Sequence, residues 1–267
     1  MTQPSHRGTA LVTGASSGIG AVYAAELARQ GYDLVLVARN RERLAALAER
    51  ITSETRRDVE VLAADLNDRD DLAAVEARLR DDASLTLLVN NAGIGTHTPL
   101  VESNVDYMTR MIELNVTALT RLTYAAVPGF VARGNGAIIN IASIVSIAPE
   151  ILNGVYGGTK AFVLAFSQSL HHELAAKGIR VQAVLPGATA TEFWETGGLP
   201  LEHLDSAIVM SAQDMVSAAL IGFERGETVT IPALHDVEQW NTFETARRAM
   251  STQLSSNTPA ARYRVAQ

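Results

Sequence analysis

The sequence contains no cysteine among its 267 residues. Disulfide bonds and cysteine-ligated metal sites are therefore excluded, and a reducing cytoplasm is the compartment that this composition favours. The amino terminus, Met-Thr-Gln-Pro-Ser-His-Arg-Gly, lacks the apolar core of a signal peptide, and no apolar run reaches membrane-spanning length. We therefore expect a soluble, cytoplasmic protein that does not bind membranes, and we predict no metal site.

Positive charge is also scarce, with 22 Lys and Arg residues against 29 Asp and Glu residues and a net charge of -7. This balance argues against a general affinity for nucleic acid or anionic lipid. Hydrophobic residues make up 47% of the chain, which is enough for a substantial core. Without internal repeats or a linker, the chain is predicted to form one α/β domain over residues 1–267.

Apolar runs typical of buried strands alternate with segments of helical periodicity. Strands are predicted over 9–12, 33–38, 59–64, 85–90, 136–142, 179–185 and 227–231. Helices are predicted over 21–30, about 105–133, about 155–176, 211–224 and 236–250, with further helical stripes near 44–51 and 72–79. The alternation predicts a Rossmann-type, doubly wound parallel β-sheet of about seven strands, flanked by helices on both faces.

Two segments depart from this alternation. Residues 188–210 form a long insertion after a predicted strand, rich in Gly, Pro and aromatic residues, and we predict a substrate loop there. A structural excursion packed against the domain is the alternative. From about residue 251 the chain is polar and is predicted to be a loose tail.

A glycine-rich turn, Thr13-Gly-Ala-Ser-Ser-Gly-Ile-Gly20, joins the first predicted strand to the first helix. Glycines at 14, 18 and 20 would let the backbone approach a pyrophosphate, and the helix amino terminus would offer unpaired N–H groups. The spacing is wider than the usual dinucleotide pattern, so by itself it also fits an ordinary turn. The flanking strand and helix favour a nucleotide site.

The second predicted strand ends without an acidic residue. Ala38 stands where an acid would hold the ribose 2′-hydroxyl of NAD, and Arg39 and Arg41 follow. An arginine in this place suits a 2′-phosphate, so the sequence favours NADP(H) over NAD(H). The alternative is that these arginines form the solvated start of the next helix.

Tyr156 and Lys160 are one helical turn apart in a predicted helix, so their side chains leave the same face. A free phenol has a pKa of ~10, and a neighbouring ammonium favours the phenolate, which makes the tyrosine a usable acid or base. The pair alone is also common on ordinary helices. Ser143, at the end of the preceding strand, adds a hydroxyl to the same region.

Taken together, these motifs resemble those of the short-chain dehydrogenase/reductase family in its compact single-domain form. The resemblance extends from residue 13 to about residue 231. It rests on Thr-Gly-x-x-x-Gly-Ile-Gly at 13–20, Asp65, Asn-Asn-Ala-Gly at 90–93, Asn115, Ser143, Tyr156-x-x-x-Lys160 and Pro186-Gly-x-x-x-Thr191. It implies a nicotinamide cofactor and assembly as a homodimer or homotetramer.

The resemblance also implies a catalytic set of Asn115, Ser143, Tyr156 and Lys160. Tyr156 would be the acid or base, and Ser143 would hydrogen-bond the carbonyl oxygen. Lys160 would depress the pKa of Tyr156 and bind the nicotinamide ribose, and Asn115 would help to hold a proton-relaying water. The alternative for Asn115 is an inward amide that satisfies a neighbouring backbone. The implied cofactor contacts are Gly14, Ser16, Ser17, Gly18, Ile19, Gly20, Arg39, Asp65, Leu66, Asn91, Ala92, Gly93, Tyr156, Lys160, Pro186, Gly187, Thr189 and Thr191.

Gly157 and Gly158 depart from the family pattern, and close approach of another backbone, such as that of a partner subunit, would explain them. The residues expected near the substrate are largely apolar: Ile94, Val145, Ile151, Leu152, Phe193 and Trp194. An apolar or partly aromatic carbonyl compound, or the matching alcohol, is therefore the expected substrate. The leading prediction is an NADPH-dependent carbonyl reductase. The alternatives are an NAD-dependent alcohol dehydrogenase, an acyl-carrier ketoreductase and a dinucleotide-binding sensor without catalysis.

Overall fold

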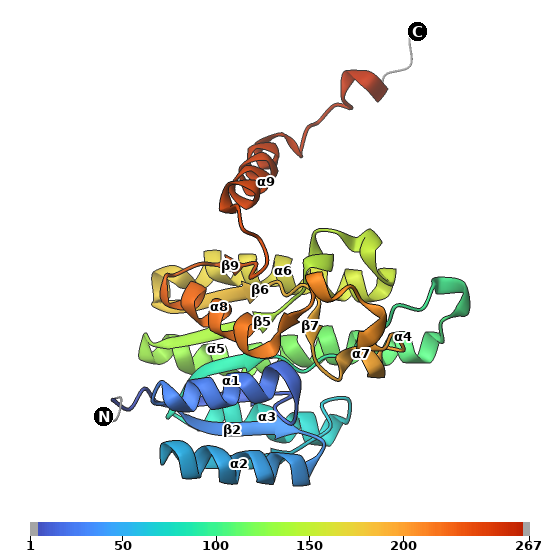
Figure 1. Ribbon diagram of the computed structural model, residues 1–267. Coiled ribbons are helices and arrows are strands. Elements are labelled where there is room, and N and C mark those ends of the chain that lie inside the picture. Colours follow the sequence, from blue (N-terminus) through green and yellow to red (C-terminus); the bar gives the residue numbers. More distant parts are fainter. Residues whose placement is uncertain (1–4, 264–267) are drawn as a thin grey trace. The chain divides into compact units, whose positions relative to one another are not determined.

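The structure of the protein is a computed structural model that describes residues 5–263 (Figure 1). These residues form two compact units that meet between Pro232 and Ala233. The single domain expected over residues 1–267, whose ends lie outside the described residues, stays a prediction.

A seven-stranded parallel sheet forms the centre of the first unit. Its strands are β1 (Thr9–Thr13), β2 (Asp33–Ala38), β3 (Val59–Ala63), β4 (Leu85–Asn90), β5 (Gly136–Ile141), β6 (Ile179–Val184) and β9 (Val229–Thr230). Their order is β3-β2-β1-β4-β5-β6-β9. The chain therefore winds outward in both directions from β1 and β4, and the carboxyl ends of these two strands border the crevice where such sheets bind ligands. The predicted Rossmann-type sheet is confirmed.

Helices cover both faces of the sheet (Figure 1). They are α1 (Gly18–Arg29), α2 (Arg41–Thr55), α3 (Arg69–Asp81), α4 (Val105–Ile112), α5 (Leu119–Arg133), α6 (Gly154–Leu174) and α8 (Ala212–Glu224). Successive strand residues point to opposite faces. Ala10 and Val12 accordingly pack in the core beneath α1, α2 and α8, whereas Leu11 packs in the core beneath α3, α5 and α6.

The predicted boundaries differ from the observed ones mainly at element ends. The first helix begins at Gly18, three residues earlier than expected, and the last strand of the sheet shortens to two residues. The 188–210 insertion contains regular structure: β7 (Thr189–Ala190) pairs with β8 (Met210–Ser211), and α7 (Phe193–Thr196) lies between them. The insertion is therefore a closed loop with a paired stem.

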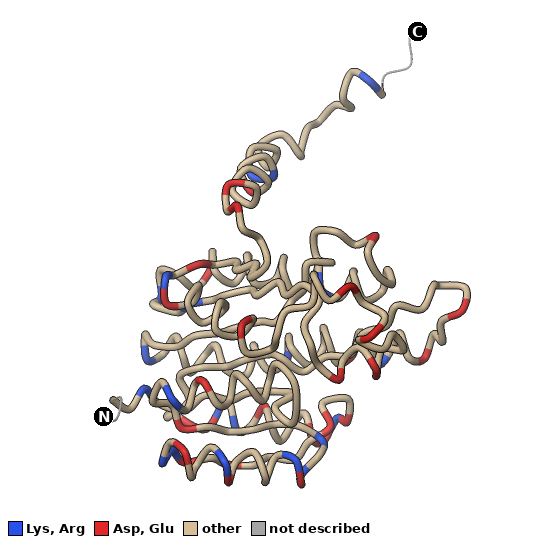
Figure 2. Tube along the Cα trace, viewed as in Figure 1, with Lys and Arg blue, Asp and Glu red and all other residues tan. Residues whose placement is uncertain are grey.

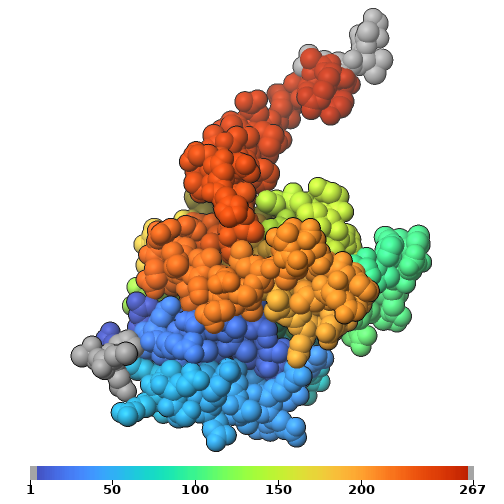
Figure 3. Space-filling view, viewed as in Figure 1, coloured from blue at the N-terminus to red at the C-terminus, as the bar shows by residue number. Residues whose placement is uncertain are grey.

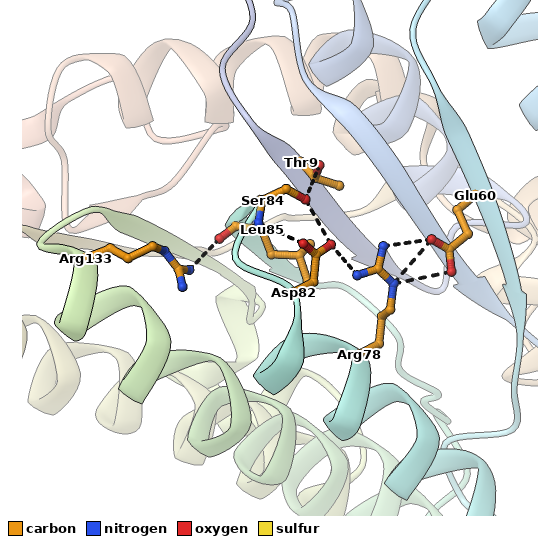
Figure 4. Close-up of polar contacts among 7 residues, drawn as sticks. All are labelled: Thr9, Glu60, Arg78, Asp82, Ser84, Leu85 and Arg133. Carbon is orange, nitrogen blue, oxygen red and sulfur yellow. Dashed lines mark hydrogen bonds and ion pairs between the residues drawn. The ribbon is translucent and has the colours of Figure 1, made fainter.

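An ionic network ties together the amino ends of the strands (Figure 4). Arg78 of α3 donates to Glu60 of β3, at 2.8 Å from Nη2 to Oε2, and to Asp82. Asp82 accepts from the backbone N–H of Ser84 at 2.8 Å, and the Ser84 hydroxyl bonds Thr9 of β1 at 2.9 Å. The opposite, carboxyl edge of the sheet holds the residues that the sequence motifs single out.

The second unit consists of α9 (Val237–Met250) followed by short 3-10 turns at Ser251–Gln253 and Ala261–Tyr263. Asp236 caps α9 by accepting a hydrogen bond from the backbone N–H of Glu238. Within residues 5–263, no helix is long and apolar enough to cross a membrane.

Candidate active site

The three glycine positions of the turn after β1 have no room for a side chain. Gly14 and Gly18 adopt φ angles of +65° and +53°, which L-residues rarely adopt. A Cβ added to Gly20 would lie 2.3 Å from the carbonyl oxygen of Gly14, so α1 approaches the strand closely. The turn leads into the amino terminus of α1, where unpaired N–H groups and the helix dipole favour an anion. These features fit the pyrophosphate of a dinucleotide.

Asn91, at the end of β4, holds this turn in place. Its Nδ2 donates to the carbonyl oxygens of Thr13 at 2.9 Å and Gly14 at 3.2 Å. The Thr13 hydroxyl accepts from the backbone N–H groups of Asn91 and Ala92, both at 3.0 Å. The side chain of Asn91 therefore positions the turn, although the sequence motif predicts that this residue lines the cofactor.

The other residues predicted on the adenosine side come from three elements. Arg39 is exposed just beyond β2, and Ser16, Ser17 and Ile19 are half-buried in the glycine turn and first turn of α1. Asp65 follows β3, and its carboxylate accepts from the backbone N–H of Asn67 at 3.0 Å. Leu66 is buried in the core with α3, so its side chain serves packing.

Lys160, Tyr156 and Ser143 lie together at the carboxyl ends of β4 and β5. The side chain of Asn153 caps α6 by accepting from the backbone N–H groups of Val155 and Tyr156, which fixes the start of the helix. Lys160 Nζ donates to the carbonyl oxygen of Ile141 at 2.9 Å and lies 5.8 Å from the Tyr156 ring centroid. The predicted pair thus shares one face of α6.

Burial governs the electrostatics of this pair. It raises the pKa of Tyr156 to about 12, against a smaller lowering by the hydrogen bond with Ser143. It lowers the pKa of Lys160 to about 8. Loss of solvation is the largest influence on the phenol, and the ammonium is anchored on Ile141; the expectation that Lys160 depresses the pKa of Tyr156 stays a prediction.

Asn115 lies in a π-helical segment, Glu113–Ala118, between α4 and α5. Its Nδ2 donates to the Ile94 carbonyl oxygen at 2.8 Å and to the Thr159 hydroxyl at 3.1 Å, and its Oδ1 accepts from the Ile94 N–H at 3.0 Å. Both amide hydrogens are thus used within the protein. This matches the inward amide that the sequence left as the alternative, and the water-holding role stays a prediction.

Gly93 lies where these groups meet. A Cβ on Gly93 would be 3.0 Å from Asn115 Oδ1 and 3.5 Å from Lys160 Nζ. The last residue of the Asn-Asn-Ala-Gly motif therefore allows the chain after β4 to pass close to the ammonium. The motif, the π-helix and α6 converge at this point.

An apolar cluster surrounds Tyr156. Of the residues predicted near the substrate, four belong to it: Ile94, Val145, Leu152 and Phe193. Ile151 is instead 54% exposed, and Trp194 Nε1 donates to the Thr189 carbonyl oxygen. Sequence reasoning missed Tyr107, Met108, Met111 and Val155, although the three-residue spacing of the two methionines marks a buried face of α4.

The base of the substrate loop returns to the glycine turn. The Pro186 carbonyl oxygen accepts from the backbone N–H of Ile144 at 3.0 Å, and the Thr189 hydroxyl donates to the Gly187 carbonyl oxygen at 3.2 Å. A Cβ on Gly18 would lie 3.1 Å from Cγ2 of Thr191. The loop and α8, coloured orange, lie beside α1, coloured blue, in the space-filling view (Figure 3).

The two glycines after Tyr156 differ in their surroundings. A Cβ on Gly157 would lie 3.4 Å from Pro149 Cβ and 3.5 Å from the backbone Cα and O of Pro149, which is an ordinary contact, and one on Gly158 would have no described neighbour within 4 Å. Among the described residues, no backbone comes so near either position that only glycine would fit. The same described part of the chain holds no group of three or more His, Asp or Glu residues that could bind a metal ion.

A family model for short chain dehydrogenases matches residues 8–198. The chain belongs to the short-chain dehydrogenase family. The matched span carries the glycine turn, Asn115, Ser143, Tyr156 and Lys160. The structure thus brings together, at one edge of the sheet, the residues that the family resemblance assigns to catalysis.

Several known oxidoreductases are similar to this chain. A Sphingobium yanoikuyae short-chain dehydrogenase solved with NADPH is 49% identical, with a TM-score of 0.92 over 97% of this chain and 100% of that one. The bulky-bulky ketone specific alcohol dehydrogenase of Comamonas testosteroni is 48% identical, with a TM-score of 0.87 over 96% and 98%. The very-long-chain 3-oxoacyl-CoA reductase of Anas platyrhynchos is 36% identical over 68% of this chain, which spans only 60% of that relative.

Proposed function

We propose that the protein is an NADPH-dependent reductase of bulky, apolar ketones, which also oxidises the corresponding alcohols. The observation that carries this proposal is the burial of Tyr156 in an apolar cluster, beside Lys160 and Ser143 and close to a turn in which Gly14, Gly18 and Gly20 leave the backbone uncovered. A proton donor and a cofactor cradle at one apolar crevice suit the reduction of a carbonyl group.

The chemistry divides among the residues of the site. A bound nicotinamide supplies the hydride. Tyr156 donates the phenolic proton to the carbonyl oxygen, and the Ser143 hydroxyl donates a hydrogen bond that stabilises the charge developing on that oxygen. Because burial raises the pKa of Tyr156 to about 12, the phenol stays protonated at neutral pH and is ready to act as the acid.

Lys160 and Asn115 act as positioning groups in this proposal. Lys160, anchored on the carbonyl oxygen of Ile141, holds a positive charge that stabilises the phenolate left after proton transfer. Asn115 fixes the backbone of Ile94, which belongs to the apolar cluster, by two hydrogen bonds. The site thus supplies an acid, an oxyanion donor and a fixed ammonium.

The preference for NADPH rests on the end of β2. Ala38 offers no carboxylate to a ribose hydroxyl, and the exposed Arg39 suits a phosphate. The similar Sphingobium yanoikuyae protein was solved with NADPH, which supports the same choice. Assembly as a homodimer or homotetramer and a cytoplasmic location remain proposals that rest on the family resemblance and on the lack of cysteine.

The proposed substrate class follows from the cluster of aromatic, aliphatic and methionine side chains around Tyr156. The similar alcohol dehydrogenase of Comamonas testosteroni is specific for bulky-bulky ketones, which supports the same substrate class. Because the chain is also similar to a 3-oxoacyl-CoA reductase, a ketone within an acyl thioester is the second candidate substrate.

Oxidation of NADPH, followed at 340 nm with a panel of ketones, tests the function. We expect turnover of aryl alkyl ketones, weaker turnover of small ketones such as acetone, and lower catalytic efficiency with NADH. Turnover of only acyl-thioester ketones would favour the second candidate. Cofactor binding without turnover of any carbonyl or alcohol would identify a dinucleotide sensor instead.

A further inference from the structure

An ion pair joins two segments that are 149 residues apart in the sequence. Arg43 Nη1 donates to Glu192 Oε2 at 2.6 Å. Arg43 lies in the first turn of α2, and Glu192 precedes α7 in the substrate loop. The pair therefore connects the adenosine side of the expected cofactor groove to the loop that carries Phe193.

The backbone around Arg43 is fixed close to the end of β2. The side chain of Asn40, the cap of α2, accepts from the Arg43 N–H at 2.9 Å. Arg39, the residue expected to meet a 2′-phosphate, ends the same strand-to-helix connection. Acidic and basic residues are interspersed along α2 (Figure 2), but no acidic residue lies three or four positions from Arg43, and Arg43 pairs with the loop instead.

The backbone around Glu192 is fixed against the glycine turn. The preceding residue, Thr191, packs against Gly18, where an added Cβ would lie only 3.1 Å from Cγ2 of Thr191. The loop therefore passes over the turn that would receive the pyrophosphate, and the Arg43–Glu192 pair continues this path to α2.

We propose that the Arg43–Glu192 ion pair is a strap across the cofactor groove, and that it slows the release of a bound dinucleotide. This inference rests on the proposed function, because it requires a dinucleotide in the groove. Both side chains are about half exposed, at 51% and 57%. Exposed pairs contribute little stability and are screened by salt, so this strap opens readily and closes again without trapping the cofactor.

Dissociation rates measured by stopped flow test the strap. The protein is loaded with NADPH, or with NADH in a parallel series, and then mixed with excess NADP⁺, so that the loss of reduced-cofactor fluorescence reports dissociation. The variants are Arg43→Met, Glu192→Gln and the double variant. The matched control is Arg29→Met, which breaks another exposed interhelix pair, with Glu54 at 3.1 Å.

We expect each single variant to speed the dissociation of both cofactors by about two- to fivefold, the range of an exposed ion pair. The double variant should release the cofactors at the same rate as the single variants, because the two side chains form one contact. Added salt should speed dissociation from the wild type more than from the variants, and Arg29→Met should behave as the wild type.

Two results would overturn the strap while leaving the proposed function intact. One is unchanged dissociation in both single variants. The other is an effect of Arg43→Met on NADPH alone with Glu192→Gln silent, which would make Arg43 a phosphate ligand only. Failure of the wild type to bind either dinucleotide would instead overturn the proposed function itself.

Discussion

Phe193 of the substrate loop packs against Tyr156, with ring centroids 5.7 Å apart and planes inclined by 44°. Gly95 makes this contact possible, because a Cβ there would lie 2.4 Å from Phe193 Cζ and 3.0 Å from Tyr156 Cε2. The loop that is expected to select the substrate therefore touches the expected proton donor directly. Changes in the loop should alter both substrate choice and the environment of the phenol.

Replacing Phe193 with alanine should shift the substrate preference. The variant loses an aromatic wall beside Tyr156, so we expect KM for aryl alkyl ketones to rise about tenfold, which corresponds to one weakened apolar contact of roughly 1.4 kcal/mol. Steady-state kinetics on an aryl ketone and a small ketone measure the change. Ile208→Ala, at an exposed position of the same loop, serves as the control, and an equal loss in both variants would count against a specific role for Phe193.

The free energy of unfolding of the wild type should depend on pH through Lys160, and the Lys160→Met variant should lack this dependence. Burial lowers the pKa of folded Lys160 from 10.5 to about 8, so between these values the unfolded chain holds a proton that the folded protein has released, and stability rises with pH. Between about pH 7.5 and about pH 9.5, the free energy of unfolding of the wild type should rise by about 2 kcal/mol relative to that of Lys160→Met. Urea unfolding at both pH values measures this, and a constant difference would show that the ammonium is not desolvated.

Arg39→Asp should move cofactor preference toward NADH. The aspartate would repel a 2′-phosphate and accept a hydrogen bond from a ribose 2′-hydroxyl. We expect the ratio of kcat/KM for NADPH to that for NADH to fall by at least about tenfold, as for the loss of one charge-assisted contact. Arg57→Asp, which makes the same charge change beyond the far end of α2, is the control. An unchanged ratio in Arg39→Asp would show that Arg39 does not determine the preference for NADPH.

Gly158 offers a test of what covers α6. Its backbone is helical and an added Cβ would meet no described atom within 4 Å, so Gly158→Ala should stabilise the protein by about 1 kcal/mol. Gly134→Ala is the matched comparison, since that site is also open but has a φ of +61°, and it should destabilise. Thermal unfolding and light scattering measure both effects. Dissociation of an oligomer in Gly158→Ala would indicate that a second copy packs on this face.

The sheet and the shared face of Tyr156 and Lys160 were predictable because their signals are local, whereas the candidate catalytic set as a whole came from the family resemblance. Buried parallel strands are short apolar runs, the glycine turn follows its strand directly, and Tyr156 and Lys160 are placed on one face by helical spacing alone. The start of the first helix was placed too late because the glycines at 18 and 20 indicate a turn, whereas they form the first helical turn.

Contacts across the chain were not predictable in the same way. The loop stem and the packing of Thr191 on the glycine turn bring Arg43 and Glu192 together. Neither residue lies in a sequence pattern that predicts which residue it will contact. The raised pKa of Tyr156 also escaped sequence reasoning, because it depends on burial by Phe193 and the methionines of α4. A neighbouring charge can be guessed from spacing, whereas desolvation requires the three-dimensional structure.

The central claim is that Tyr156 donates the proton in a carbonyl reduction, and Tyr156→Phe tests it most directly. The variant keeps the ring that packs in the apolar cluster and loses only the hydroxyl. We predict that its kcat for ketone reduction falls by at least about a thousandfold, as for the loss of a general acid, while its Kd for NADPH, measured by fluorescence titration, stays within about twofold. Retention of most of the wild-type kcat, with normal NADPH binding, would contradict the account.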